Sequence, residues 1–98
     1  MRVHAVVGVA SLAAAAALLT ADPTAALHIE GFTDDVGDPA NNFDLAQRRA
    51  DNGKTVIGAT LARRIAAIGR GETSFAVPNT SESNRARNRR IVLTVLAP

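Results

Sequence analysis

One apolar run near the N-terminus limits the folds open to this chain more than any other feature. From Ala5 to Leu19 nearly every residue is apolar, and the run ends at Asp22-Pro23. A membrane-spanning helix needs about 20 consecutive apolar residues, so this run is too short to cross a bilayer. Two interpretations remain: a secretory signal cleaved after small residues near Ala21 or Ala26, and a helix packed within the domain.

We favour a domain helix from about Ala10 to Thr20. At 98 residues the chain has room for one core, and only 3% of its residues are aromatic, so the core must be built mainly from Ala, Val, Leu and Ile. Loss of the segment as a signal would leave the remaining sheet without this helix to cover it. Residues 1–9 are then an N-terminal segment, either a remnant strand or the start of a signal, and residues 10–98 form one domain.

Two strands and a long helix are predicted after this segment. Leu27–Glu30 alternates apolar and polar residues, which is typical of a strand with one buried face, and Arg64–Ile68 is the second strand. Between them a helix runs from about Asp44 to Thr60, with Asp44 and Gln47 spaced as a variant capping box. Its core face has a weak point at Gly53, where the facing sheet has no side chain to pack on. That face comprises Leu45, Ala46, Ala50, Gly53, Ile57 and Leu61.

The C-terminal part predicts a short helical turn and a final strand. Asn79-Thr80-Ser81 offers a cap for a turn through Asn84–Asn88, and Arg90–Leu96 is rich in β-branched and large aliphatic residues. The polar stretch Phe32–Pro39, rich in Asp, Gly and Pro, is a loop and the expected functional surface.

Catalysis and metal binding find little support in the sequence. The chain has no cysteine, and its two histidines, His4 and His28, lie near no nucleophile motif. Asp34, Asp35 and Asp38 lack the regular ligand spacing of a calcium loop. We therefore expect a protein that is not an enzyme, with no metal site and no cofactor.

Four short motifs occur in a characteristic order: Ile29-Glu30-Gly31-Phe32-Thr33-Asp34, Leu45-Ala46-Gln47-Arg48-Arg49-Ala50, Gly69-Arg70-Gly71-Glu72 and Asn84-Arg85-Ala86-Arg87-Asn88-Arg89-Arg90-Ile91. Each is weak alone. In this order and spacing they resemble the landmarks of the outer membrane protein A-like, peptidoglycan-binding domain family, and the match runs from about Ala17 to Val95.

The resemblance implies an α+β fold, with a small mixed sheet and two helices packed on one face. The family has a strand before its first helix, whereas only Met1–Val9 remain here, so we expect the N-terminal strand to be missing or truncated. Phe32 stands where the family usually has His, and Gly53 replaces a usual aliphatic residue.

The resemblance also implies a ligand, the diaminopimelate of the peptidoglycan stem peptide, held by Asp34 and Arg49. The far end of diaminopimelate is a zwitterion, and a carboxylate and a guanidinium can bind its ammonium and its carboxylate. The alternative is a structural salt bridge between Asp34 and Arg49. Further ligand-binding residues implied by the family are Thr33, Asn42, Asn88 and Arg89.

The expected function is non-covalent anchoring of an envelope protein to the cell wall, on the periplasmic face and associated with the outer membrane. Membrane association would come only from a missing or partner segment, and a homo-oligomer is compatible with this function. The alternative is nucleic-acid binding through Arg85, Arg87, Arg89 and Arg90. We expect no nucleic acid as partner, because aromatic residues for stacking and a helix that reads bases are lacking.

Overall fold

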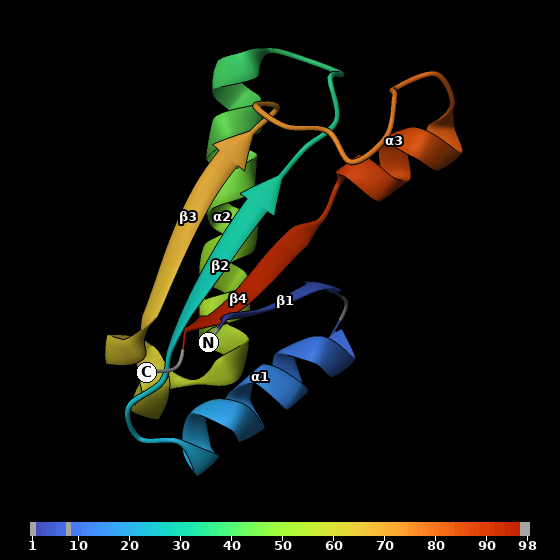
Figure 1. Cartoon of the computed structure of the whole chain (residues 1–98). Coiled ribbons are helices and arrows are strands. Elements are labelled where there is room, and N and C mark those ends of the chain that lie inside the picture. The colour runs from blue at the N-terminus through green and yellow to red at the C-terminus, as the bar shows by residue number, and fades with distance from the viewer. Residues whose placement is uncertain (1, 8, 97–98) are drawn as a thin grey trace.

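A four-stranded mixed sheet forms the centre of the molecule (Figure 1). The computed structural model describes residues 2–7 and 9–96, with side chains from residue 12 onward. The strand order is β1-β4-β2-β3, with β4 antiparallel to both β1 and β2, and β3 parallel to β2. The strands are β1 (Arg2–Val7), β2 (Ala26–Phe32), β3 (Ile65–Gly71) and β4 (Ile91–Leu96).

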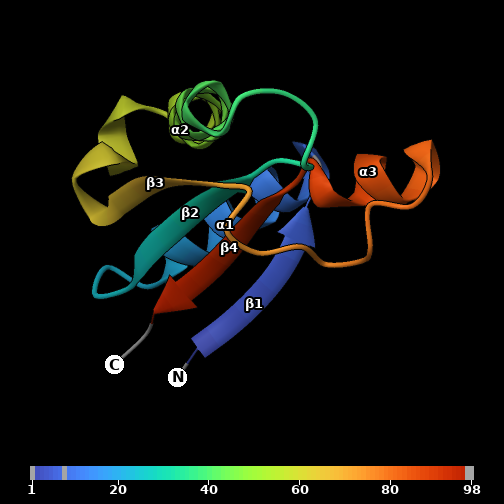
Figure 2. The ribbon, with the colours of Figure 1, turned by 90° about the horizontal axis from the view of Figure 1, so that it is seen from above.

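Two helices, α1 (Val9–Ala21) and α2 (Pro39–Ile57), pack on one face of this sheet. Ile29 of β2 marks that face, because a Cβ placed on Gly53 of α2 would lie 3.4 Å from Ile29 and 3.6 Å from Leu12 of α1. The predicted α+β fold, with two helices on one face of a mixed sheet, is therefore confirmed. Figure 1 shows α2 running lengthwise behind β2 and β3, and Figure 2, which views α2 end-on, shows the short α3 (Glu82–Asn88) beyond the end where β4 begins.

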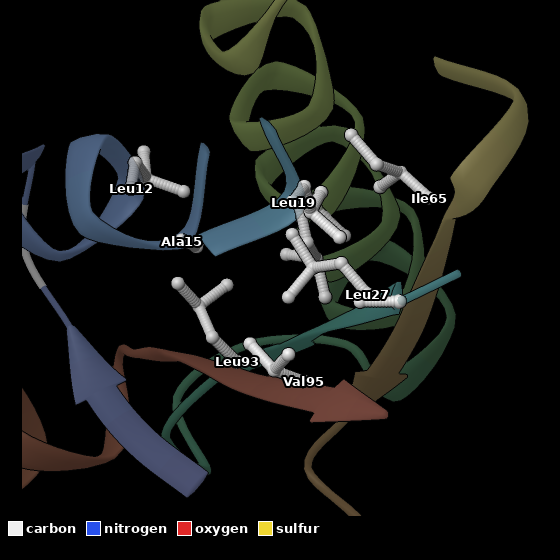
Figure 3. Packing of buried hydrophobic residues seen from close by; sticks show 10 residues of the cluster. Leu12, Ala15, Leu19, Leu27, Ile65, Leu93 and Val95 are labelled. Carbon is white, nitrogen blue, oxygen red and sulfur yellow. The ribbon is translucent and has the colours of Figure 1, made fainter. Parts of the chain in front are cut away.

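The core lies between α1, α2 and the sheet (Figure 3). Leu27 and Ile29 are two residues apart on β2 and therefore face the same side, where both are completely buried. From α1, Leu12, Ala15 and Leu19 pack against them, which matches the domain helix predicted from about Ala10 to Thr20. Within the described part of the chain, no helix is long and apolar enough to cross a membrane. The remaining buried members are Ala25, Ala50, Ile65, Leu93 and Val95.

The N-terminal strand is present, and the expectation that it is missing is wrong. Arg2–Val7 forms β1 and pairs antiparallel with the whole of β4, from Arg2 opposite Leu96 to Val7 opposite Ile91. The alternation within this segment is imperfect, and its strand structure comes from pairing with a partner far away in the sequence.

The N-terminus of α2 also differs from the prediction. The helix begins at Pro39 and not near Asp44, because the Asp38 side chain accepts a hydrogen bond of 2.8 Å from the Ala40 amide and Pro39 occupies the first helical turn. Asp44 is therefore within the helix and pairs with Arg48 at 3.2 Å. The expected capping box does not form.

Gln47 instead joins α2 to the outer edge of β3. Its side chain donates to the Ala67 carbonyl at 2.9 Å and accepts from the Gly69 amide at 2.8 Å. These two contacts imitate the hydrogen bonds of a neighbouring strand and satisfy part of an edge that is otherwise unpaired.

Two glycines of the sheet, Gly31 and Gly69, allow α2 to lie close to it. A Cβ on Gly31 would clash with the Ala46 carbonyl, and one on Gly69 would lie 2.6 Å from the Gln47 nitrogen, so the helix backbone rests directly on β2 and β3. At Gly53 the expected gap is absent, because Ile29 and Leu12 fill the space beside it. The α2 backbone is thus fixed against two strands close to Arg49.

Candidate ligand-binding site

The loop that follows β2 lies at one end of the sheet, beside the start of α2 and the start of β4 (Figure 1). Thr33 and Asp34 are its first two residues. Thr33 is only 1% exposed, its amide donates to the Gly71 carbonyl at 2.9 Å, and its hydroxyl donates to the Asp34 carbonyl at 3.0 Å. The Thr33 contacts join the loop to the end of β3 and hold the backbone of Asp34.

The Asp34 carboxylate is nearly buried and is bound on both oxygens. Its Oδ1 accepts from the Val36 amide at 3.0 Å, and its Oδ2 accepts from Nη1 of Arg89 at 2.7 Å. Burial alone would raise the pKa of Asp34, but the hydrogen bonds from Arg89 and Val36 outweigh it and hold this pKa below its ordinary value. Asp34 is therefore a fixed carboxylate that is ionised at neutral pH.

Arg89 lies between two carboxylates. Its Nη1 contacts Asp34, and its Nη2 contacts Oε1 of Glu82 at 2.6 Å. Glu82 also accepts from Nε of Arg85 at 3.2 Å. The contacts with Asp34 and then Glu82 raise the pKa of Arg89, while the contacts with Arg89 and then Arg85 lower the pKa of Glu82.

Arg49 approaches the same end of β2 from α2. Its Nη1 donates to the carbonyl of Phe32, the residue that ends β2, over a long distance of 3.4 Å. No ion pair found among residues 12–96 includes Arg49, whereas its neighbour Arg48 pairs with Asp44 in solvent. Arg49 therefore has donors left for an anionic group.

A pocket of about 300 Å³ lies between α2, α1 and the start of β4. Arg49, Arg89 and Arg90 contribute to its wall, and none of the described lining residues is acidic. The guanidinium of Arg90 lies 4.1 Å from the centroid of the Phe32 ring, and burial lowers the pKa of Arg90. The other lining residues are Leu12, Asn52, Gly53, Val56 and Ile91, so the pocket wall combines three arginines with mostly apolar residues.

The two asparagines of the predicted site hold loops. Asn42 is 7% exposed, and its Nδ2 donates to the Val36 carbonyl at 3.0 Å and to Glu72 at 3.3 Å. These bonds support the loop that carries Asp34.

Asn88 is completely buried and turns toward residues 76–79. Its Oδ1 accepts from the amides of Ala76 and Val77 at 2.8 and 3.1 Å. Its Nδ2 donates to the Val77 carbonyl at 2.9 Å and to Oδ1 of Asn79 at 2.8 Å. These four bonds fix the segment that leads into α3.

The structure thus brings Asp34, Arg49 and Arg89 to the end of β2, with Thr33 and Asn42 supporting the loop. The ion-pair partner of Asp34 is Arg89, not the Arg49 of the salt-bridge alternative. Sequence reasoning missed Glu82, although it lies seven residues before Arg89 and therefore two helical turns away on the same face. Among the residues that the structure describes, no group of acidic or histidine side chains could hold a metal ion.

The chain belongs to the OmpA family, whose model matches residues 8–89. Outer membrane porin F of Pseudomonas fluorescens is 39% identical over 76% of this chain and 24% of its own length. The peptidoglycan-associated lipoprotein of Pasteurella multocida is 39% identical over 84% of this chain and 56% of its own length. The chain therefore spans only part of these relatives.

A solved structure, the cell wall anchor of the T6SS from Pseudomonas aeruginosa, has a similar fold. It superposes with a TM-score of 0.75 at 32% identity, over 91% of this chain and 66% of that one.

Proposed function

We propose that this domain binds peptidoglycan non-covalently and anchors an envelope protein to the cell wall. Membership of the OmpA family supports this, as do relatives named a peptidoglycan-associated lipoprotein and a cell wall anchor. These relatives and an outer membrane porin are envelope proteins by name, which supports a place at the periplasmic face of the outer membrane. None of these names denotes an enzyme, in keeping with a binding role.

The proposed ligand is the free end of diaminopimelate in the stem peptide. One observation carries the proposal: an ionised, nearly buried carboxylate and a guanidinium without an ion-pair partner among residues 12–96 flank the same strand end. Asp34 would bind the ammonium, and Arg49 would donate two parallel hydrogen bonds to the carboxylate. The cationic pocket wall adds to the attraction for that carboxylate.

The remaining predicted site residues would act around this clamp. Thr33 and Asn42 would hold the Asp34 loop in place for the ligand, and Arg89 would line the groove beside it. The buried Asn88 would act indirectly, by fixing the segment that leads into α3. A homo-oligomer, and membrane attachment through a separate segment, also stay predictions.

Binding to purified sacculi that contain diaminopimelate tests the proposal at the level of the cell wall. We expect the wild type to sediment with the sacculi, and Asp34→Asn and Arg49→Ala to stay in solution. Asp35→Asn and Arg48→Ala are the matched controls, because each alters the exposed neighbour of a site residue. If the folded wild type stays in solution, the proposed function is wrong.

Three synthetic stem tripeptides test the chemistry of the ligand. They differ only at the far end of the third residue, which carries a zwitterion (diaminopimelate), an ammonium alone (lysine) or a carboxylate alone (2-aminopimelate). A charge-assisted hydrogen bond contributes about 1.5–3 kcal/mol, so we expect lysine to bind about tenfold to a hundredfold more weakly than diaminopimelate. Arg49→Ala should abolish that difference. Equal binding of all three peptides would contradict the proposed clamp.

Nucleic-acid binding, the alternative function, is not favoured. Two of the four C-terminal arginines, Arg85 and Arg89, are paired with carboxylates, and Arg90 is partly covered against Phe32. The cluster is therefore not an open cationic surface for phosphates. A steep salt dependence of DNA binding would contradict this assignment.

A further inference from the structure

A guanidinium binds the Asp34 carboxylate within the protein itself. Arg89 binds Oδ2 of Asp34 at 2.7 Å, and this is the carboxylate that the proposed function assigns to the ligand's ammonium. An ammonium that enters the site must therefore share Asp34 with Arg89 or replace it. The cost of that exchange depends on where Arg89 goes.

Asp34 itself is not free to move. Its other oxygen accepts the Val36 amide, and its backbone carbonyl accepts the Thr33 hydroxyl. With its side chain 9% exposed, Asp34 is held from several directions. The mobile partner of the pair is therefore the longer Arg89, whose side chain is 33% exposed.

Glu82 offers Arg89 a second carboxylate on the solvent side. Nη2 of Arg89 lies 2.6 Å from Glu82, whose side chain is 68% exposed. Because the two carboxylates bind different nitrogens of one guanidinium, Arg89 can leave Asp34 and keep its contact with Glu82. Arg85 also contacts Glu82 and holds this carboxylate at the open side of the site.

We propose that Glu82 is a positioning residue that retains Arg89 when the ligand's ammonium takes its place on Asp34. This inference rests on the proposed function. With Glu82, a released Arg89 keeps one charged partner; without it, Asp34 is the partner that remains and release is more costly. Glu82 therefore strengthens the binding of ligands that carry an ammonium, although it makes no contact with the ligand itself.

The test uses Glu82→Gln, which removes the charge and keeps the size of the side chain. The affinities of the full chain for the three tripeptides are measured by isothermal titration calorimetry. An exposed ion pair contributes up to about 1 kcal/mol, so we expect the diaminopimelate and lysine peptides to bind about two- to fivefold more weakly. The 2-aminopimelate peptide, which has no ammonium at its far end, should bind as it does to the wild type.

Asp44→Asn is the matched control, because it removes an exposed carboxylate from another arginine pair, at Arg48, and should change none of the three affinities. A merely structural role of Glu82 would weaken all three peptides alike and would overturn the inference. Unchanged binding of the ammonium-bearing peptides would overturn it as well. If the wild type binds none of the peptides, the proposed function fails, and the inference fails with it.

Discussion

Asp34 and Arg89 are 55 residues apart in the chain, and their side chains meet at 2.7 Å. Asp34 is the second residue after β2, and Arg89 is the residue that caps the C-terminus of α3, just before β4. Because β2 and β4 are hydrogen-bonded neighbours, with Gly31 opposite Ile91, this ion pair closes the end of the sheet on which the proposed ligand site is built. Protonation of Asp34 at low pH would therefore both lower the free energy of unfolding and disturb the proposed ligand site.

Acid should weaken the fold through Asp34. Its folded pKa is depressed, so the stability that it contributes is fully present above the unfolded pKa of about 3.9 and is lost as the pH falls through the lower folded pKa. We expect Asp34→Asn to lower the free energy of unfolding by about 1–2 kcal/mol at pH 7 and by less at pH 2.5. Urea unfolding at both pH values measures this, with the exposed Asp35→Asn as control. An equal loss at both pH values would contradict the assignment.

Gly31→Ala should destabilise the protein. The added methyl would clash with the Ala46 carbonyl. Neither group can rotate away, because the position of a Cβ is fixed by its own backbone and the carbonyl is part of the helix backbone. Overpacking of this kind costs about 1–3 kcal/mol in the free energy of unfolding, measured by urea denaturation. A variant as stable as the wild type would show that α2 lies farther from β2 than described.

Gly53→Ala should stabilise the protein, in contrast to Gly31→Ala. The added methyl would make ordinary contacts at 3.4 Å with Ile29 and 3.6 Å with Leu12, and alanine is favoured over glycine in a helix interior by about 1 kcal/mol. We expect a gain of about 0.5–1 kcal/mol in the same denaturation experiment. A loss of stability would mean that the space beside Gly53 is smaller than these distances indicate.

Gln47→Ala should expose the edge of β3. Without the Gln47 side chain, the Gly69 amide and the Ala67 carbonyl lose their partners on that side. We expect faster hydrogen exchange at the Gly69 amide and a loss of about 1–2 kcal/mol in stability. The adjacent Arg48→Ala, which removes an exposed i,i+4 pair, should leave the exchange of Gly69 unchanged.

Asn88→Asp should damage the segment at residues 76–79. The substitution keeps the acceptor for Ala76 and Val77 but removes both donors, and it places a carboxylate against the Val77 carbonyl and the Asn79 side chain. A buried charge without these donors should cost about 2–3 kcal/mol of stability at neutral pH, and less at low pH where the acid is protonated. Thermal unfolding at pH 7 and pH 4 measures the difference, which should be absent in Asn41→Asp on the surface.

The sequence predicts those helices and strands whose pattern is contained within the segment itself, namely β2, β4 and the start of α3. Leu27–Glu30 alternates, Arg90–Leu96 is rich in β-branched residues, and Ser81 accepts from the Asn84 amide at 3.1 Å as an N-cap should. The predicted start of α2, near Asp44, is wrong because Asp38-Pro39 is the N-terminal cap of the helix and not part of the loop before it. Pro39 favours the first turn of a helix as well as a loop, so the sequence pattern alone did not decide between the two.

Features set by distant pairing could not be predicted in the same way. β1 depends on its register with β4, whose residues lie 84 to 94 positions further along the chain, from Val7 opposite Ile91 to Arg2 opposite Leu96. The family resemblance assigns Asp34, Arg49 and Arg89 to one ligand-binding site, but the ion pair of Asp34 with Arg89 and the contact with Glu82 depend on how α3 is oriented. No periodic pattern in the sequence predicts the orientation of α3 relative to the sheet.

The contact of the α2 backbone with Gly31 and Gly69 has a consequence for changes in chain length. It fixes the rotational phase of the helix, and one residue corresponds to about 100° of rotation in an α-helix with 3.6 residues per turn. A single insertion between Gln47 and Arg49 would therefore turn the guanidinium away from the end of β2 even if the helix stayed intact. Length variation is therefore compatible with this site only outside that stretch of α2.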